Sequence, residues 1–187
     1  MTGDDPISDA GKRWRDRGHA PVPIATRAPA TASAPSRLLR RRSLTCAHCG
    51  YGAYYNPKPV AAAIPRDDDG RIVLLRRGFD PGAGLWTFPG GFVDLGESVE
   101  EAALRETREE LEMDIELDGL VGVYSRADER VVLVVFQARA LSPPSTTEEA
   151  TEVNAFASGE LPWDELAFWS TEVALRDALA RGYPSER

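Results

Sequence analysis

The stretch from Gly90 to Met113 constrains the fold of this chain more than any other, because it predicts a helix and the face that this helix buries. Ser98 and Glu101, three residues apart, form a capping box, so we expect a helix to begin at Val99. With about 3.6 residues per turn, the apolar side chains of this helix fall on one stripe. That stripe is the predicted buried face, made of Val99, Ala103, Leu104, Thr107 and Leu111.

The same helix carries a high density of acidic side chains. Five of the eleven residues from Glu100 to Glu110 are glutamates. Glu109 and Glu110 follow Glu106 by three and four residues, so the three side chains meet at the edge of the buried stripe. Poor dielectric screening at such a boundary makes their mutual repulsion larger. We expect the remaining charged side chains to point to solvent: Glu101, Arg105, Arg108 and Glu112.

A bound cation would offset this repulsion. Three carboxylates at fixed helical spacing can hold Mg²⁺ or Mn²⁺, hard cations that also take water and phosphate oxygens. The segment LWTFPGG, which ends at Gly91, predicts a Pro-Gly-Gly turn where backbone groups approach a metal or a phosphate closely. For the glutamates alone, the alternative is an ordinary solvated acidic helix. The glycine turn and its fixed spacing to Glu97 favour the metal site.

The rest of the body contains strand patterns. The runs VAAAI and RIVLLRR predict two strands joined by a hairpin turn with Asp69 and Gly70 at its tip. A second pair of strands flanks the polar segment RADER, and the apolar run of its second strand predicts burial on both faces. The five expected strands cover Val60–Ile64, Arg71–Arg77, Leu117–Ser125, Val131–Ala140 and residues 151–157.

The C-terminal segment predicts a second helix. Ser170 or Thr171 would cap its beginning, and Gly182 would stop it. Its expected apolar positions are Val173, Leu175, Ala178 and Leu179. Together, the strands and helices predict an α+β sandwich.

Charge divides the chain into two parts. The net charge is -8, but residues 1–45 hold nine basic and four acidic side chains, which gives +5, and the remaining 13 basic and 26 acidic side chains give -13. Residues 1–45 are rich in Pro and Ala without apolar periodicity, so we expect a disordered basic tail, with a transit peptide as the alternative. The acidic body argues against binding to a nucleic-acid backbone and suits a site that concentrates divalent cations.

Cys46 and Cys49 are the only cysteines, and they define a knuckle segment at residues 46–58. A C-x2-C pair supplies half of a tetrahedral zinc site. The other half is missing, because only His48 and His19 remain as further ligands of this kind. We therefore expect a reduced pair without Zn²⁺, with zinc binding as the alternative.

The spacing from Gly91 to Met113 resembles the Nudix box, G-x5-E-x7-R-E-U-x-E-E-x-G-U, where U is a bulky apolar residue. Thr107 stands at one apolar position, and Glu112 replaces the glycine that normally ends the helix. A glutamate there costs about 1 kcal/mol for a left-handed conformation, or the helix ends differently. Seven positions fall in register: Gly91, Glu97, Arg105, Glu106, Glu109, Glu110 and Met113.

The resemblance covers the chain from about Cys46 to Leu179. It is similar to a group of Nudix proteins with a zinc-ribbon-like segment before the domain, here with one cysteine pair instead of two. It implies a Nudix α/β/α sandwich with a mixed β-sheet over residues 59–182. It also implies a hydrolase, dependent on Mg²⁺ or Mn²⁺, that cleaves the pyrophosphate bond of a nucleoside diphosphate linked to another group.

The resemblance assigns the metal ligands. Glu106 and Glu110 would be the principal ligands, Glu109 would share a second ion, and the carbonyl of Gly90 would complete the shell.

The remaining catalytic roles are less determined. By the resemblance, Arg105 would orient the carboxylates through Glu97 or Glu109. The residue that accepts the proton stays open, and Glu106 is the preferred one. The alternatives lie on a later loop and are Glu148, Glu149 and Glu152.

The substrate is the least determined part. The segment LPWDELAFWST is similar to that of relatives acting on ADP-ribose and FAD, so one of these or a similar dinucleotide or nucleotide sugar is expected. Arg76 and Arg77 end a strand near the glycine turn and would contact phosphate. Trp86 and Phe88 would stack on a base, with a place in the core as the alternative.

Two other functions stay open from the sequence. A catalytically idle Nudix module that senses nucleotides or ADP-ribose would usually lose a box glutamate, and all three are present. Decapping of RNA 5′ ends would need a basic surface, and only the tail is basic. We therefore expect a cytoplasmic enzyme that acts on a small-molecule nucleotide, with no membrane segment and no nucleic-acid partner. A homodimer is left open.

Overall fold

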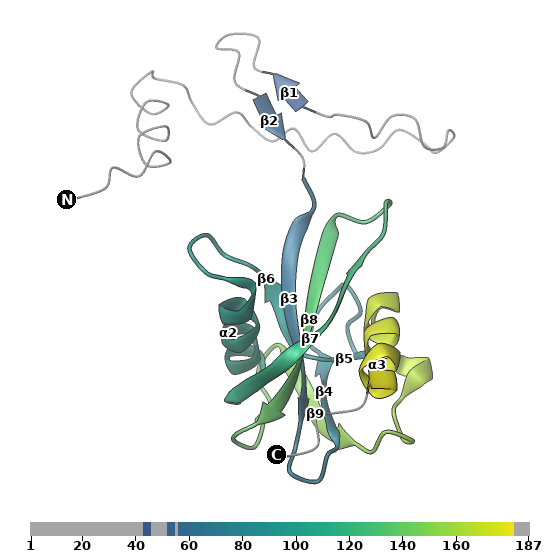
Figure 1. Ribbon diagram of the computed structural model, residues 1–187. Coiled ribbons are helices and arrows are strands. Elements are labelled where there is room, and N and C mark those ends of the chain that lie inside the picture. The colour runs from purple at the N-terminus through teal and green to yellow at the C-terminus, as the bar shows by residue number, and fades with distance from the viewer. Residues whose placement is uncertain (1–42, 46–51, 55, 182–187) are drawn as a thin grey trace, which may run out of the picture. The chain divides into compact units, whose positions relative to one another are not determined.

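The computed structural model describes residues 43–45, 52–54 and 56–181 (Figure 1). Most of the predicted tail, and both Cys46 and Cys49, lie outside the described residues, so tail disorder and the zinc alternative stay predictions. Two short strands, β1 (Ser43–Thr45) and β2 (Gly52–Tyr54), form a two-stranded sheet. The sequence did not predict these strands, because three residues are too few to show a period.

The main body is built on a mixed sheet, as predicted, and this sheet has seven strands. Five strands follow the order β5-β4-β3-β8-β7, while β6 pairs with β3 and β9 pairs with β4. The central strand β3 is parallel to β8 and antiparallel to β4 and β6. The strands are β3 (Lys58–Arg66), β4 (Ile72–Arg77), β5 (Trp86–Thr87), β6 (Gly90–Phe92), β7 (Ile115–Ser125), β8 (Val131–Ala140) and β9 (Ala150–Phe156).

Each of the five predicted strands is present, and both predicted hairpins pair antiparallel. The predicted burial of Val131–Ala140 on both faces is confirmed in the middle of β8, where residues 135–138 are all buried. Two short strands were not predicted. Gly90 and Gly91, expected in a turn, instead lie in β6, because they pair with β3 across the sheet.

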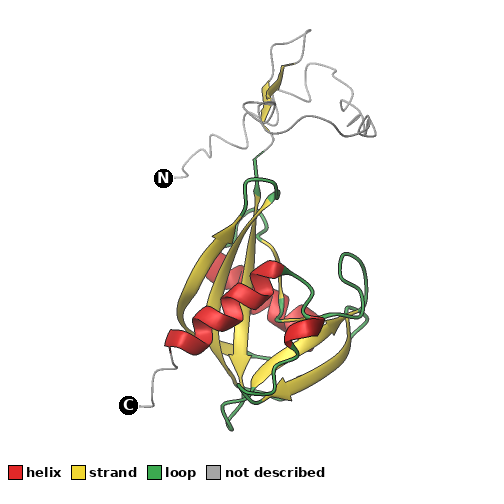
Figure 2. Cartoon of the chain, turned by 90° about the vertical axis from the view of Figure 1, so that its right-hand side faces the viewer, coloured by secondary structure: helices red, strands yellow, loops and turns green. Residues whose placement is uncertain are grey.

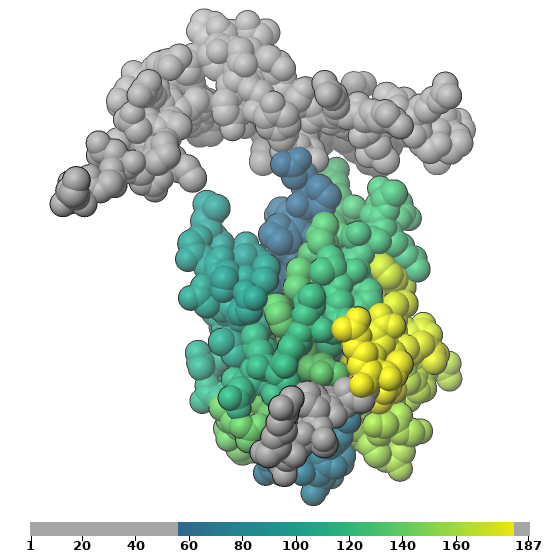
Figure 3. Space-filling model, in the orientation of Figure 1, coloured from purple at the N-terminus to yellow at the C-terminus, as the bar shows by residue number. Residues whose placement is uncertain are grey.

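Two helices cover the two faces of the sheet, α2 (Val99–Leu111) on one side and α3 (Trp169–Arg181) on the other. Figure 2 shows them on opposite sides of the strands, and Figure 3 shows the teal α2 region and the yellow α3 at opposite sides of the body. A short 3-10 helix, η1 (Trp163–Glu165), precedes α3. The α+β sandwich is therefore confirmed. None of the described helices is long and apolar enough to span a membrane.

Alternation along β3 explains the two-sided core. Ala61 packs with the alanines of α2, and Ala63 packs with Leu111 at the end of that helix. Ala62 and Ile64 point to the other face and pack in the cluster that contains the buried residues of α3. Side chains of successive strand residues point to opposite faces, so this run of small and β-branched residues serves both halves of the sandwich.

Helix α2 begins as predicted. The amide of Glu101 donates to Ser98 Oγ at 3.2 Å, and the amide of Ser98 donates to Glu101 Oε2 at 2.7 Å, which completes the capping box. The helix ends at Glu112 in a left-handed conformation (φ 51°, ψ 28°), the first of the two alternatives. Its buried face differs from the predicted stripe, since Val99 and Leu104 are only partly buried. The buried residues are Ala102, Ala103, Thr107, Glu110 and Leu111.

Helix α3 begins one residue before the predicted caps, so the prediction that Ser170 or Thr171 caps it is wrong. The Phe168 carbonyl accepts hydrogen bonds from the amides at the start of this helix. Thr171 is buried instead, and its hydroxyl lies 3.1 Å from the Thr87 hydroxyl. Val173 is exposed, contrary to prediction. Leu175 and Ala178 are buried and Leu179 packs against the same cluster.

Candidate active site

The glycines of β6 bring this strand unusually close to its neighbours. Gly90 pairs with Ala62, and a Cβ added at Gly90 would lie 2.4 Å from the Ala62 Cβ and 2.7 Å from a backbone oxygen. A Cβ added at Gly91 would lie 2.3 Å from the carboxylate carbon of Glu106. Ordinary contacts begin near 3.4 Å. The two glycines therefore let β6 lie against the sheet and let the Glu106 carboxylate of α2 lie against β6.

Glu110 is the most buried acidic side chain of the site, at 6 % exposure. Its Oε2 accepts a hydrogen bond of 2.9 Å from the amide of Gly90. The pKa of Glu110 is raised to about 7, mainly by burial and also by the charges of Glu106 and Glu149, against the opposing effects of the Gly90 amide and the Arg77 charge. A carboxylate held at the edge of ionisation in this way is stabilised in its charged form by a nearby cation.

Glu106 and Glu109 occupy different environments. The Glu106 side chain is 15 % exposed, and burial is the largest cause of its raised pKa. The Glu109 side chain is 59 % exposed. Glu106 and Glu110 thus form the inner pair, while Glu109 lies at the outer rim.

Arg105 lies among these carboxylates, so the prediction that it points to solvent is wrong. Its Nε and Nη2 donate to both oxygens of Glu97, at 3.0 and 2.8 Å. Its Nη1 donates to Glu106 and to Glu109, each at 2.8 Å. The paired guanidinium lowers the pKa of Glu97 to about 2. A fifth bond, to the Phe92 carbonyl, ties the same guanidinium to β6.

The donor set suits a hard divalent cation better than Zn²⁺, because it consists of carboxylates and nearby backbone carbonyls. Among the described residues, no three acidic, His or Cys side chains are already gathered as a metal site. The reason lies in the contacts above, since Glu106 and Glu109 face Arg105 and Glu110 faces the Gly90 amide. The inner pair, whose pKa values are both raised, nevertheless fits a cation that would replace these contacts.

The buried Glu110 predicts an unusual stability profile for the metal-free protein. Its pKa is about 7 in the fold against an ordinary value of 4.5, so the folded state binds more protons between these values. The free energy of unfolding should therefore fall as the pH rises from about 4.5 to 7 and change little above that, by on the order of 3 kcal/mol in total. Urea unfolding in EDTA at pH 5, 6, 7 and 8 measures this. The Glu110→Gln variant should lack the fall, and an identical profile in both proteins would contradict the assignment.

The aromatic residues predicted to stack on a base lie in the core. Trp86 is 3 % and Phe88 is 4 % exposed. One face of Trp86 is covered by the Arg76 guanidinium, at 4.6 Å from the ring centroid, and its ring makes an edge contact with Phe156. The alternative that the sequence left open, a structural place in the core, is what the structure shows, so neither ring is offered to a base.

The two arginines at the end of β4 differ in their contacts. Arg76 is engaged with Glu152 at 2.9 Å, with Glu165 at 3.1 Å and with the Gly84 carbonyl at 2.6 Å. Arg77 donates its Nε to the Pro81 carbonyl at 2.7 Å. Within residues 56–181, the terminal nitrogens of Arg77 have no hydrogen bond or ion pair. Arg77 is therefore the one of the two whose donors are free for a phosphate.

Of the three late glutamates, Glu149 lies beside the site. Its charge contributes to the raised pKa of both Glu106 and Glu110. Glu152 is paired with Arg76. A residue that sequence reasoning missed holds this loop in place.

That residue is Thr147. Its hydroxyl donates to the Glu110 carbonyl at 2.9 Å and accepts from the amides of Glu149 and Ala150. A threonine two and three residues before the amides that it accepts from is a local turn motif visible in the sequence. Its second bond, to the end of α2, depends on the tertiary fold and has no local signal.

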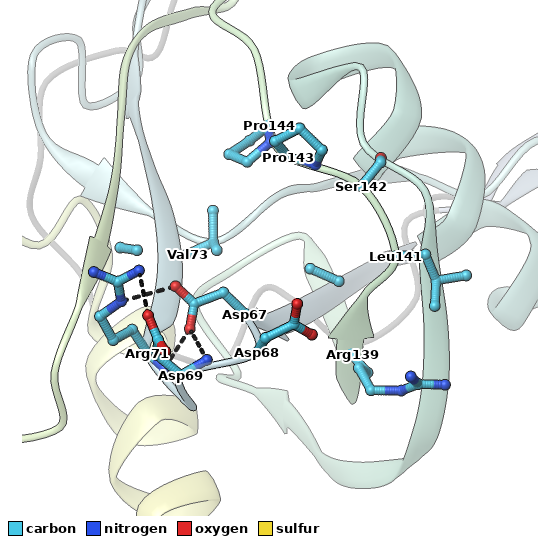
Figure 4. A pocket seen from close by; sticks show the side chains of 12 residues that line it. Asp67, Asp68, Asp69, Arg71, Val73, Arg139, Leu141, Ser142, Pro143 and Pro144 are labelled. Atoms are coloured by element: carbon cyan, nitrogen blue, oxygen red, sulfur yellow. Dashed lines mark hydrogen bonds and ion pairs between the residues drawn. The ribbon is translucent and has the colours of Figure 1, made fainter.

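A cavity of about 550 Å³ lies away from these carboxylates, at the turn between β3 and β4 (Figure 4). Its acidic wall is the turn itself, where Asp67 accepts from the amides of Asp69 and Arg71 and from the Arg71 side chain. Figure 4 shows Pro143 and Pro144 on the opposite wall. The turn carboxylates thus stabilise the hairpin.

Comparison with known proteins agrees with this description. The family model of the NUDIX domain matches residues 56–181. The chain is 32% identical over 137 residues to an ADP-ribose pyrophosphatase from Methanocaldococcus jannaschii, which covers 71% of this chain and 77% of the relative. It is 34% identical over 131 residues to a MutT-like protein from Streptomyces ambofaciens, covering 68% and 80%. A crystal structure of a NUDIX hydrolase from Nitrosomonas europaea matches with a TM-score of 0.70 at 29% identity, covering 78% of this chain and 84% of that one.

The family match and the relatives named pyrophosphatase and hydrolase show that this α/β/α sandwich is a hydrolase domain. The chain belongs to the Nudix family, which confirms what the spacing from Gly91 to Met113 predicted.

Proposed function

We propose that this Nudix hydrolase cleaves the pyrophosphate bond of a nucleoside diphosphate linked to another group. The observation that carries the proposal is the inner pair of carboxylates, the buried Glu110 and the partly buried Glu106, against the glycine strand β6. Similarity to a relative named ADP-ribose pyrophosphatase supports ADP-ribose as the first substrate to test. FAD, a similar dinucleotide and a nucleotide sugar belong to the same chemical class.

The residues divide into distinct roles in this proposal. Glu106 and Glu110 would hold Mg²⁺ or Mn²⁺ together with the carbonyl of Gly90, and Glu109 would share a second ion. When bound, such a cation neutralises the diphosphate and acidifies water near the phosphorus. Arg105 holds Glu106 and Glu109 in place through its guanidinium, as its contacts support.

Two residues are supported as the proton acceptor. Glu106 is the one that the sequence favours, and its raised pKa suits a general base. Glu149 is supported because its charge acts on both inner carboxylates, although it comes from a different loop. The pH-rate profile of Glu149→Gln would assign the role, because Glu149 is not one of the proposed metal ligands. Loss of the acidic limb would make Glu149 the proton acceptor, and a retained acidic limb would leave Glu106.

Arg77 is the proposed phosphate contact. The charge of Arg77 lowers the pKa of Glu110, which supports a position of its guanidinium near the inner carboxylates. Its terminal nitrogens form a fork that matches two phosphate oxygens. Arg76 has a structural role instead in this proposal, since its guanidinium is already paired with Glu152 and Glu165.

The experiment that tests the proposal is a substrate panel with product masses as the readout. ADP-ribose, FAD, NADH, diadenosine polyphosphates, coenzyme A and 8-oxo-dGTP would be incubated with Mg²⁺ or Mn²⁺. Products cut between two phosphates, from at least one compound that carries a nucleoside diphosphate, are expected. Absence of any such cleavage with either metal would overturn the proposal.

The two other functions are separated when capped RNA and a binding measurement are added to the panel. A sensing module would bind ADP-ribose without turnover. A decapping enzyme would prefer capped RNA, with binding that weakens steeply as salt rises. A cytoplasmic location and a homodimer stay predictions.

A further inference from the structure

Phe79 is a large apolar side chain at 46 % exposure, in the loop between β4 and β5. Single exposed apolar residues are common, so exposure alone says little. This ring is distinguished by its partner, because the Arg77 guanidinium lies over it at 5.0 Å from the centroid. The same guanidinium lies 5.2 Å from the ring centroid of Phe168. Two rings and a cation therefore gather at one point of the surface.

The loop that carries Phe79 is held at both ends. The amide of Arg77 donates to the Leu85 carbonyl at 3.0 Å, and the amide of Gly84 donates back to the Arg77 carbonyl at 2.8 Å. In the middle of the loop, Gly82 lies so close to Ala167 that an added Cβ would come within 3.2 Å of the Ala167 Cβ. The ring thus stands on a fixed loop, which lowers the entropy lost when a ligand stacks on it.

The loop that carries the ring is joined to the loop that carries Glu149. Gly78, the residue between Arg77 and Phe79, donates its amide to the Glu149 carbonyl at 2.8 Å. Arg77 itself acts on the charge of Glu110. Consecutive Cα atoms are about 3.8 Å apart, so the Cα of Phe79 lies at about that distance from the Cα of Gly78, the residue bonded to Glu149. A diphosphate at the carboxylates would therefore bring its nucleoside within reach of this ring.

We propose that Phe79, supported by Arg77, is the surface on which the planar base of the substrate stacks. The inference rests on the proposed function and deepens it, since it makes the aromatic base a determinant of specificity. Stacking suits any base, because every base has a π face. The enzyme would accordingly prefer pyrophosphates that carry a base on the side of this loop over those that carry only sugar and phosphate.

The test compares Phe79→Leu with Phe79→Tyr, which keeps the ring. Calorimetry would measure the binding of AMP and of ribose 5-phosphate, in the presence of Mg²⁺. Phe79→Leu should weaken AMP binding about tenfold and leave ribose 5-phosphate unchanged, while Phe79→Tyr stays near the wild type. With ADP-ribose as substrate, the Leu variant should show a KM raised by a similar factor and an unchanged kcat, as loss of uniform binding predicts.

Val123→Ala is the matched control, because Val123 is a similarly exposed apolar residue on β7. It should change the affinity for neither AMP nor ribose 5-phosphate. All variants should melt near the temperature of the wild type, since these side chains are exposed. If the wild type turns over ADP-ribose, two results would overturn this inference alone. One is that Phe79→Leu weakens the binding of AMP and of ribose 5-phosphate equally, and the other is that it binds AMP as tightly as the wild type does. A wild type that neither binds AMP nor cleaves any compound of the panel would overturn the proposed function as well.

Discussion

Glu110→Gln should reduce turnover by a factor of about 100 or more while the protein stays folded. The substitution keeps the size of the side chain and an oxygen that can accept from the Gly90 amide. It removes the negative charge that would hold the cation, and stabilisation by the cation is worth several kcal/mol, with about 1.4 kcal/mol for each factor of ten.

The melting temperature gives the second half of this prediction. Because burial already opposes the charge of Glu110, the metal-free variant should melt at the same temperature as the wild type or higher near pH 8. Steady-state kinetics and thermal unfolding of the same preparations measure both quantities. Glu100→Gln, which removes an exposed glutamate from the first turn of α2, is the control and should change neither. A near-normal rate in Glu110→Gln would contradict its role as a ligand.

Gly91→Ala and Gly90→Ala should separate activity from stability. The three atoms nearest to an added Cβ at Gly91 all belong to the movable carboxylate of Glu106, so the carboxylate should be displaced while the fold survives. We expect a loss of turnover of about 100-fold, comparable to losing a ligand, with a melting temperature close to that of the wild type.

The added Cβ at Gly90 meets Ala62 and the backbone oxygen of Ala61, which belong to the central strand β3 and cannot move freely. Gly90→Ala should therefore destabilise the fold by about 1 to 3 kcal/mol. Gly159→Ala is the control, since an added Cβ there meets nothing within 4 Å. Denaturant unfolding and kinetics on the three variants check the pattern. A Gly91→Ala variant with full activity would show that the close approach of Glu106 to β6 is not needed.

Local patterns in the sequence predicted most of the fold. The capping box at Ser98 and Glu101 placed the start of α2 correctly, because both of its bonds lie within one turn. The strands with strong β-branched runs were also predicted correctly, because their pattern lies within a few consecutive residues. The start of α3 was missed, since Thr171 looks like a cap locally but is buried against Thr87 from a distant strand.

The candidate site was predicted in composition more than in arrangement. Spacing identified Glu106, Glu109 and Glu110, but it could not show that Arg105 turns inward, because that depends on Glu97 in the loop before the helix and on the carbonyl of β6. Burial of Trp86 likewise depends on packing across the sheet. The role of the loop near Thr147 has the same origin, a contact between segments far apart in the sequence.

The central claim is that a divalent cation explains why acidic side chains gather beside β6. Its most direct measurement is a calorimetric titration of Mn²⁺ into the metal-free protein with AMP present, repeated with Glu110→Gln and with Glu100→Gln. We predict saturable binding in the wild type and in Glu100→Gln, and binding at least tenfold weaker in Glu110→Gln. No binding in the wild type, or the same affinity in Glu110→Gln, would contradict the claim.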